Sequence, residues 1–154
     1  MTLVLSCFPA TGKTHYFNNN KETCLDSDSS KFDKANFPQN YIDHIKENLN
    51  KGYEFILVST HKEVRAALVE AGIEFCIVCP MKTDKLAYLE RYIRRGSSIE
   101  FLRFMDKNWL SFIDEIFKFK KDNNIKFACV GSERYLSDCV EELLDKSSSF
   151  WISE

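Results

Sequence analysis

The residue types with the clearest chemical potential are Gly12, Lys13 and Thr14, which follow a short apolar run at residues 3–5. They match the last three positions of the G-x-x-x-x-G-K-[ST] pattern, whereas Cys7 stands where that pattern has its first glycine. In the pattern a strand ends in a tight loop whose backbone N–H groups point at a phosphate, and the lysine reaches the terminal phosphates. The Thr14 hydroxyl is an oxygen ligand of the kind that Mg²⁺ prefers.

We therefore expect a nucleotide phosphate loop here, and the alternative is an ordinary strand-to-helix turn. The residues expected to contact the nucleotide are Phe8, Pro9, Ala10, Thr11, Gly12, Lys13 and Thr14.

Two carboxylates, Asp26 and Asp28, follow the next apolar residues and stand two positions apart. Side chains leaving a strand at that spacing tend to point the same way. One carboxylate can orient or deprotonate an acceptor hydroxyl while the other holds Mg²⁺ directly or through water. We assign Asp26 and Thr14 to the metal, and Asp28 and Ser29 to the acceptor. The alternative is a solvated Asp/Ser turn.

Arg91, Arg94 and Arg95 have the i, i+3, i+4 spacing that places side chains on one face of a helix. Arginine binds phosphate oxygens bidentately and keeps its charge, so we expect at least one of the three to contact phosphate. The alternative is a solvated basic face. His61 follows the apolar run at residues 55–58, where it would contact the substrate or cap the next helix. The predicted catalytic residues are Lys13, Asp26, Asp28, Arg91, Arg94 and Arg95.

Composition narrows the class of protein. The 154 residues indicate one domain, which we place at residues 1–146 with a tail at 147–154. A net charge of −2 gives no basic field for nucleic acid, and no apolar run is long enough to span a membrane. The first strand is expected at residue 2, which leaves no room for a signal peptide.

The six cysteines lie mostly in or beside apolar runs, as is typical of buried thiols in a reducing cytoplasm, so we expect a cytoplasmic protein. Cys76 and Cys79 on a strand would point to opposite faces, which suits neither a zinc site nor a redox pair. The sequence is compatible with a monomer or a homodimer.

Apolar runs typical of buried strands alternate with stretches of helical periodicity along the chain. The expected strands are residues 2–6, 23–25, 55–58, 75–78 and 126–130, and the expected helices start near residues 13, 38, 62, 83, 97 and 135. This alternation predicts a mainly parallel sheet with right-handed crossovers and helices on both faces. The residues with chemical potential fall at the carboxyl ends of strands, where such sheets bind ligands.

The expected helices near residues 83 and 97 both carry apolar residues at helical spacing. In the helix near residue 83 these are Leu86, Leu89, Tyr92 and Ile93, and Ser97 with Glu100 resembles a capping box for the next helix. That next helix has apolar residues at spacings of three and four, namely Leu102, Met105, Trp109, Phe112, Ile113 and Ile116. We interpret this stripe as core rather than as a cofactor site.

These motifs together resemble a known family. Residues 8–14, Phe-Pro-Ala-Thr-Gly-Lys-Thr, resemble the Phe-Pro-Gly-Thr-Gly-Lys-Ser/Thr loop of small phosphate-loop (P-loop) kinases. Residues 25–28 are similar to the Asp-x-Asp strand end of nucleoside, gluconate and adenylylsulfate kinases, and residues 91–96 are similar to their lid helix. Over nearly its full length the chain resembles the compact nucleotide-kinase-like proteins common in phage genomes. It departs from the family at Cys7 and Ala10, both usually glycine, and in lacking a separate lid insertion.

The resemblance implies a three-layer P-loop NTPase fold, with a five-stranded parallel sheet in order 2-3-1-4-5. It also implies ATP as donor, with Lys13, Thr14, Asp28 and the arginines as the working residues. We therefore expect an ATP- and Mg²⁺-dependent kinase that acts on a hydroxyl or phosphate of a small molecule, foremost a nucleoside or nucleotide.

Two further hypotheses remain open. The acceptor could belong to nucleic acid or to a modified base in DNA, although the mild acidity of the chain disfavours this. The chain could instead be a non-catalytic module that binds or sequesters a nucleotide. The altered glycines favour such a module, whereas the retained Lys13, Thr14 and Asp28 oppose it.

Overall fold

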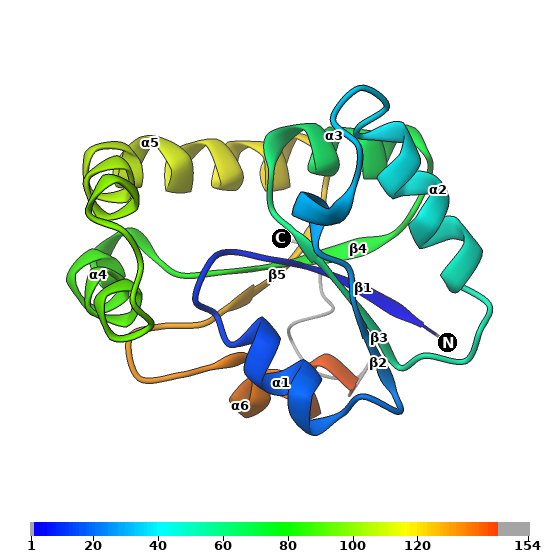
Figure 1. Cartoon of the computed structure of the whole chain (residues 1–154), viewed down its shortest axis with the longest axis horizontal. Helices are drawn as coiled ribbons and strands as arrows, with labels where there is room; N and C mark the ends of the chain where they lie inside the picture. The colour runs from blue at the N-terminus through cyan, green and yellow to red at the C-terminus, as the bar shows by residue number, and fades with distance from the viewer. Residues whose placement is uncertain (1, 145–154) are drawn as a thin grey trace.

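The computed structural model describes residues 2–144, which form an α/β fold around one five-stranded sheet (Figure 1). The strands are Leu3–Cys7 (β1), Cys24–Asp26 (β2), Phe55–Ser59 (β3), Phe75–Cys79 (β4) and Lys126–Cys129 (β5). All neighbouring strands run parallel, in the order β2-β3-β1-β4-β5. The predicted parallel sheet and its strand order are therefore confirmed. The predicted tail, residues 147–154, lies outside the described residues.

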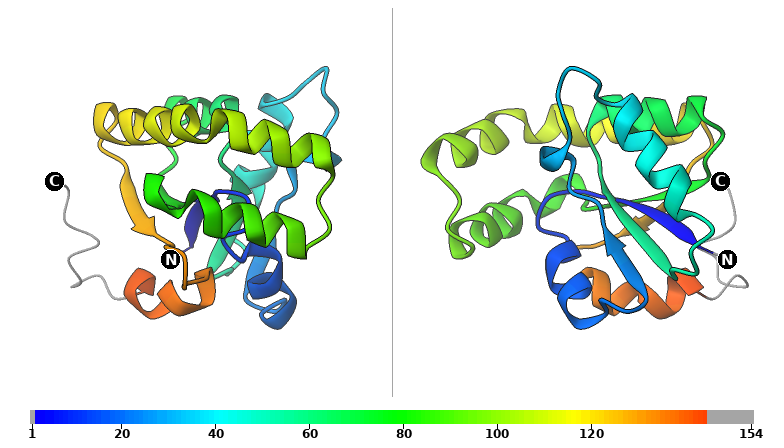
Figure 2. Two further views of the ribbon diagram at one scale, coloured as in Figure 1. Left: turned by 90° about the vertical axis from the view of Figure 1, so that its left-hand side faces the viewer. Right: turned by 45° about the vertical axis from the view of Figure 1, so that its right-hand side comes forward.

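Six helices connect or follow these strands in the described part of the chain. They are Lys13–Asn19 (α1), Gln39–Asn48 (α2), Lys62–Glu70 (α3), Lys85–Arg94 (α4), Ile99–Asp122 (α5) and Leu136–Leu144 (α6), with short 3₁₀ turns at Ser29–Lys31 and Lys82–Asp84. Helices α2, α3 and α5 cover one face of the sheet, and α1 and α6 cover the other (Figure 1). Helices α4 and α5 form a hairpin that extends beyond the sheet at the carboxyl ends of the central strands (Figure 2).

Two apolar clusters hold these layers together, one on each face of the sheet. Strand β3 serves both, because Ile56 and Val58 belong to the α2–α3–α5 side whereas Phe55 and Leu57 belong to the α1–α6 side. A strand buried on both faces has no polar alternation, which explains why the strands read as continuous apolar runs. None of the helices within residues 2–144 has the length and apolar character needed to cross a membrane.

Cys76 and Cys79 lie in opposite clusters, as their spacing on β4 predicts. All six cysteines of the chain are free thiols. Their distribution over both clusters is that of small core side chains.

Local details of the α4–α5 hairpin differ from the prediction. Ser98, not Ser97, caps α5, because its Oγ accepts a hydrogen bond of 3.2 Å from the amide of Phe101. Leu86 and Ile93 of α4 are 80% and 61% exposed, and α4 buries Tyr88, Arg91 and Tyr92 instead. Of the four apolar residues expected in this helix, Tyr92 is buried and Leu89 packs against the core, whereas Leu86 and Ile93 face outward and Tyr88 and Arg91 complete the buried face.

Candidate functional site

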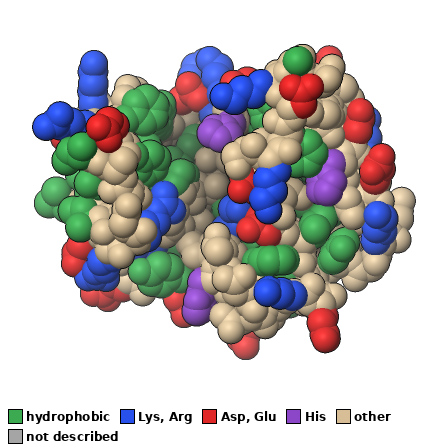
Figure 3. Space-filling model, in the orientation of Figure 1, with side chains coloured by type: hydrophobic (Ala, Val, Ile, Leu, Met, Phe, Trp, Pro, Cys, Tyr) green, Lys and Arg blue, Asp and Glu red, His purple; other side chains and the backbone are tan. Residues whose placement is uncertain are grey.

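A cleft of about 1130 Å³ opens at the carboxyl ends of β1, β2 and β3. Its walls come from residues 7–15 after β1, residues 27–29 after β2, residues 59–65 after β3, and the α4–α5 hairpin. Figure 3 shows the hollow between the α4–α5 side, where hydrophobic side chains gather, and an opposite side that carries more Lys, Arg, Asp, Glu and His. The edge of the sheet at which parallel strands bind ligands is thus hollowed out.

Residues 8–14, which we call the GKT loop, turn back from β1 into α1. The amides of Phe8 and Thr11 are used inside the protein, in hydrogen bonds of 2.9 and 3.3 Å to the carbonyls of Val78 and Phe8. Among residues 2–144, no acceptor takes up the amides of Gly12, Lys13 or Thr14. These three N–H groups stand free at the cleft wall, as a phosphate-binding loop requires.

Two residues of the GKT loop have left-handed backbone angles, Ala10 with φ 69° and Gly12 with φ 98°. A Cβ at position 12 would lie 3.2 Å from the Cβ of Tyr135, so both the angle and the space call for glycine there. Ala10 adopts a left-handed φ although its Cβ makes that angle less favourable than it is for glycine. Cys7 is an ordinary buried strand residue, so its departure from the glycine pattern leaves the loop geometry intact.

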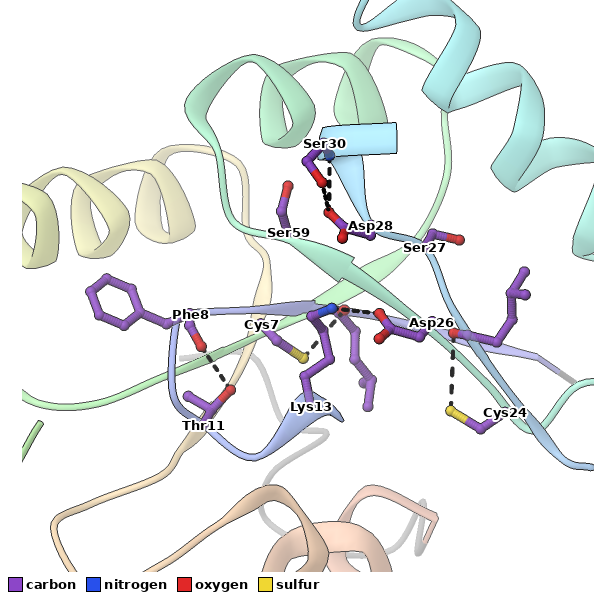
Figure 4. Close-up of polar contacts among 12 residues, drawn as sticks. Cys7, Phe8, Thr11, Lys13, Cys24, Asp26, Ser27, Asp28, Ser30 and Ser59 are labelled. Atoms are coloured by element: carbon purple, nitrogen blue, oxygen red, sulfur yellow. Dashed lines mark hydrogen bonds and ion pairs between the residues drawn. The ribbon is translucent and has the colours of Figure 1, made fainter. Parts of the chain in front are cut away.

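Lys13 and Asp26 form an ion pair between the start of α1 and the end of β2 (Figure 4). Their side chains are 23% and 16% exposed, so the pair is largely shielded from water. Asp26 thereby holds the Lys13 ammonium at the base of the GKT loop. The assignment of Asp26 to a metal stays a prediction.

Asp28 contacts a different neighbour. Its Oδ1 accepts hydrogen bonds from the amide and the hydroxyl of Ser30, at 2.9 and 2.8 Å (Figure 4). These bonds lower the pKa of Asp28 below its ordinary value of 3.8. The chain leaves β2 at Asp26, so strand alternation ends there and the two carboxylates serve separate partners. Asp28 and Ser29 both line the cleft, and their assignment to the acceptor stays a prediction.

Arg91 is tied into the fold, being only 6% exposed. Its guanidinium lies over the rings of Tyr88 and Tyr135, at 4.4 and 3.9 Å from their centroids. It donates to four backbone carbonyls, those of Ala10, Gly131, Ser132 and Arg134. Arg91 therefore joins the GKT loop to the β5–α6 connection, a different role from the phosphate contact expected of these arginines.

The other two arginines are exposed and also line the cleft. Arg94 pairs with Glu90 one helical turn away, and their side chains are 67% and 60% exposed. Arg95 donates from Nε to Ser97 at 3.1 Å and lies over the rings of Tyr92 and Phe101, at 5.1 and 5.5 Å. Of the three, Arg95 is the one whose guanidinium has no carboxylate or carbonyl partner among the described residues, and it can turn to a phosphate.

The wall contributed by α5 contains aromatic residues that the sequence analysis did not assign to the site. Phe101 and Phe104 line the cleft, and Phe104 is 53% exposed. The predicted core stripe is buried at Trp109 and Ile113, which confirms that part of the interpretation. Met105 and Ile116 of this stripe are also buried, and together with Phe112 they line the cleft. In the sequence, Phe101 and Phe104 beside the stripe were the signal that could have indicated this aromatic wall.

Residues after β3 complete the site. His61 is exposed at the start of α3, its side chain caps nothing, and it lines the cleft. Ser59, Thr60 and Arg65 also line the cleft and were not predicted. No sequence pattern marked them, because serine, threonine and arginine after a strand are common in ordinary connections.

Within residues 2–144, no three His, Cys, Asp or Glu side chains cluster closely enough to hold a metal ion by themselves. Mg²⁺ keeps several waters and binds phosphate oxygens, so Thr14 with one carboxylate is a sufficient protein share. Thr14 lines the cleft and Asp26 pairs with Lys13 of the GKT loop, so a hydroxyl and a carboxylate are available to such an ion.

Comparison of the chain with protein-family models, with curated proteins and with solved structures gave no match.

Proposed function

We propose that this chain is an ATP- and Mg²⁺-dependent kinase of the P-loop class, acting in the cytoplasm on a nucleoside or nucleotide. The observation that carries the proposal is the GKT loop, where the free amides of Gly12, Lys13 and Thr14 stand beside the Lys13 ammonium at the cleft. A row of unclaimed amide donors is the chemistry that a polyphosphate needs, and Lys13 adds its charge when Asp26 exchanges the ammonium for the metal ion. The strand order β2-β3-β1-β4-β5 is the one the P-loop resemblance implies, which supports the class.

The proposed roles follow from the positions of the side chains. The loop amides and Lys13 bind the phosphate oxygens, and Thr14 with Asp26 holds the metal ion. Bound Mg²⁺ would neutralise charge on the phosphates. Asp28 accepts a hydrogen bond from the acceptor hydroxyl and orients it, and Arg95 supplies positive charge from the α4–α5 side.

The Lys13→Ala variant tests the proposal. ATP affinity, measured by calorimetry with Mg²⁺, should fall, and transfer of radiolabelled phosphate to a panel of nucleosides, nucleotides and oligonucleotides should vanish. Lys118→Ala is the matched control, because Lys118 lies on α5 with an 81% exposed side chain paired to Asp122, outside the cleft. Unchanged ATP affinity and transfer in Lys13→Ala would remove the phosphate-loop assignment.

A second candidate function is a nucleotide-binding module without transfer. It is favoured by the commitment of Arg91 to backbone carbonyls and of Arg94 to Glu90, which leaves few cations for a transferring phosphoryl group. Arg95→Ala separates the two functions. In a kinase, groups aimed at the transition state affect turnover more than affinity, so turnover should fall at least about 10²-fold.

Arg95→Lys is the control for geometry, and it should restore little turnover because lysine lacks the bidentate fork. A module would show the reverse pattern, with weaker nucleotide binding in Arg95→Ala and no turnover in the unmodified protein.

A further inference from the structure

Two buried polar atoms in the described chain have no hydrogen-bond partner, and they belong to Ser59 and Arg65. The atoms are the Ser59 hydroxyl oxygen and the Arg65 Nη1 nitrogen, and both residues line the cleft. Buried polar groups are almost always paired, so each exception calls for an explanation. Ser59 ends β3 and Arg65 lies on α3, the next element, so a ligand at this wall of the cleft would supply the missing partners.

The Arg65 guanidinium is held in one orientation although it is only 3% exposed. Its Nε donates to the carbonyl of Thr60 at 2.8 Å, and its Nη2 donates to Glu115 at 2.6 Å. It also lies over the ring of Phe119, 5.0 Å from the centroid. Because the guanidinium is a rigid planar fork, these contacts also fix the direction in which Nη1 donates.

The charge of this subsite decides which ligand group fits. Glu115 lines the cleft and neutralises Arg65, so a phosphate or carboxylate placed at Nη1 would meet a carboxylate of like charge. An uncharged carbonyl oxygen accepts from Nη1 without that repulsion. The Ser59 hydroxyl both donates and accepts, so it can pair with either kind of group beside that carbonyl.

The apolar wall next to Glu115 gives the shape. Phe112 and Ile116 lie one turn before and one residue after Glu115 on α5, and both line the cleft. Phe104 continues this wall with its ring 5.4 Å from that of Phe112. A wall of aromatic and branched side chains beside a few polar atoms favours a flat ring with a polar edge.

The acceptor hydroxyl and this ring would lie within one ligand. Asp26 of β2 pairs with Leu57 of β3, so Asp28 and Ser59, each two residues later, leave neighbouring strands at the same level. Figure 4 shows both side chains on the same side of the strand ends. A nucleoside has this layout, with a sugar hydroxyl at one end and a polar ring edge at the other.

We propose that Ser59 and Arg65 form a nucleobase subsite that accepts a base with a carbonyl edge, that is, a pyrimidine or an oxopurine. This inference rests on the proposed function, since it assigns the cleft beside Asp28 to the phosphoryl acceptor. Adenine presents an amino group where hypoxanthine and guanine present a carbonyl. Its donor would face the Nη1 donor, so the subsite disfavours adenine.

Equilibrium binding of inosine and adenosine to the full chain without ATP tests the subsite, since these nucleosides differ only in the group at C6 and in the proton on the adjacent N1. Inosine should bind at least roughly tenfold more tightly than adenosine, the size of one hydrogen bond. Ser59→Ala and Arg65→Lys should each lower inosine affinity by about tenfold and leave Mg²⁺–ATP affinity unchanged. Ser111→Ala, on the exposed face of α5, is the matched control and should change neither.

If Arg65→Lys fails to fold, Ser59→Ala still tests the subsite. The Ser59 hydroxyl has no hydrogen-bond partner among the described residues, so its removal breaks no bond within the protein. Equal affinity for the two nucleosides, or unchanged inosine affinity in Ser59→Ala, overturns the subsite. Lys13-dependent ATP binding in the same preparations would leave the kinase proposal standing, so the two failures are distinguishable.

A single-stranded oligonucleotide of hypoxanthine bases, with an adenine oligonucleotide as its control, forms a separate arm. Binding of the former alone, lost in Ser59→Ala, supports the subsite and identifies nucleic acid as the source of the base. Failure of both inosine and the oligonucleotide to bind overturns it.

Discussion

The Asp28 carboxylate accepts two hydrogen bonds from Ser30, and these set the chemistry that it can perform. Because its pKa lies below 3.8, it is an anion at every pH at which the protein would be assayed. A carboxylate so stabilised is a weak base, but its remaining lone pairs can accept a hydrogen bond from a hydroxyl. Asp28 is therefore better suited to orienting an acceptor hydroxyl than to removing its proton early in the reaction.

Asp28→Asn should reduce turnover by roughly 10²-fold while ATP affinity stays the same, because the neutral amide holds the acceptor hydroxyl less strongly and cannot take up its proton as transfer proceeds. Steady-state kinetics and calorimetry on one preparation measure both quantities. Asp33→Asn is the matched control, because Asp33 accepts from the amide two residues on, at 3.1 Å, outside the cleft. Near-normal turnover in Asp28→Asn would exclude Asp28 from the mechanism.

The lowered pKa of Asp28 also has a consequence for pH. A depressed carboxyl pKa contributes stability that is complete above the ordinary value of 3.8 and is lost as the pH falls through the folded-state value. Asp28 should therefore produce no acid limb in the activity profile above that pH. A limb at higher pH would have to come from another group.

At the scale of elements, the α4–α5 hairpin is fastened to the GKT loop through Arg91. The guanidinium bonds to the Ala10 carbonyl at 2.9 Å and to carbonyls of the β5–α6 connection. Helix α4 cannot swing over the cleft as a rigid body without breaking these bonds. Closure, if it accompanies binding, therefore has to come from exposed side chains such as Arg95.

Arg91→Met should lower the free energy of unfolding by about 3 kcal/mol, because it leaves several buried carbonyls without a donor. Arg94→Met removes the same charge and keeps the same side-chain stem. It should change stability by less than about 0.5 kcal/mol, since its pair with Glu90 is exposed. Urea unfolding of both variants measures the difference in stability. Equal stabilities would contradict the structural role given to the Arg91 hydrogen bonds.

At the scale of the whole molecule, the two clusters bury thiols on both faces of the sheet. Burial raises the pKa of Cys7 and of Cys24 to about 12, and it also raises the pKa values of Cys76 and Cys79. Only the thiolate reacts with alkylating reagents, so a buried thiol is protected both by its inaccessibility and by its raised pKa. Thiol labelling therefore reports on the integrity of the entire core.

Native protein at neutral pH should be labelled by an alkylating reagent at least roughly a hundredfold more slowly than protein in urea. Cys129 should react first, because it is the only one of the six cysteines that is not fully buried. Mass spectrometry of tryptic peptides after timed quenching identifies the labelled residues. Rapid native labelling of Cys7 or Cys24 would contradict the packing described for the α1–α6 side.

Much of the architecture was predictable from the sequence, because local patterns determine it. Strands buried on both faces read as apolar runs, and alternating helices require parallel connections. The position of the GKT loop after β1 follows from adjacent residues, and so does the place of Asp28 after β2. The residue at which helix α5 begins was less predictable. Ser97 and Ser98 are equally good caps by residue type, and only the helix geometry selects Ser98.

The sequence by itself determined the sheet, its order by resemblance, and the side of it on which polar residues gather. Only the tertiary structure decided which of those residues are free to act. Arg91 finds its carbonyl partner at Ala10, and Arg65 finds Glu115, across long stretches of chain. Helical and strand periodicities specify the face on which a side chain lies, but its partner depends on how distant elements pack. For that reason the sequence could name the arginines of α4, whereas the fold assigned one to structure and revealed Ser59 and Arg65 in the cleft.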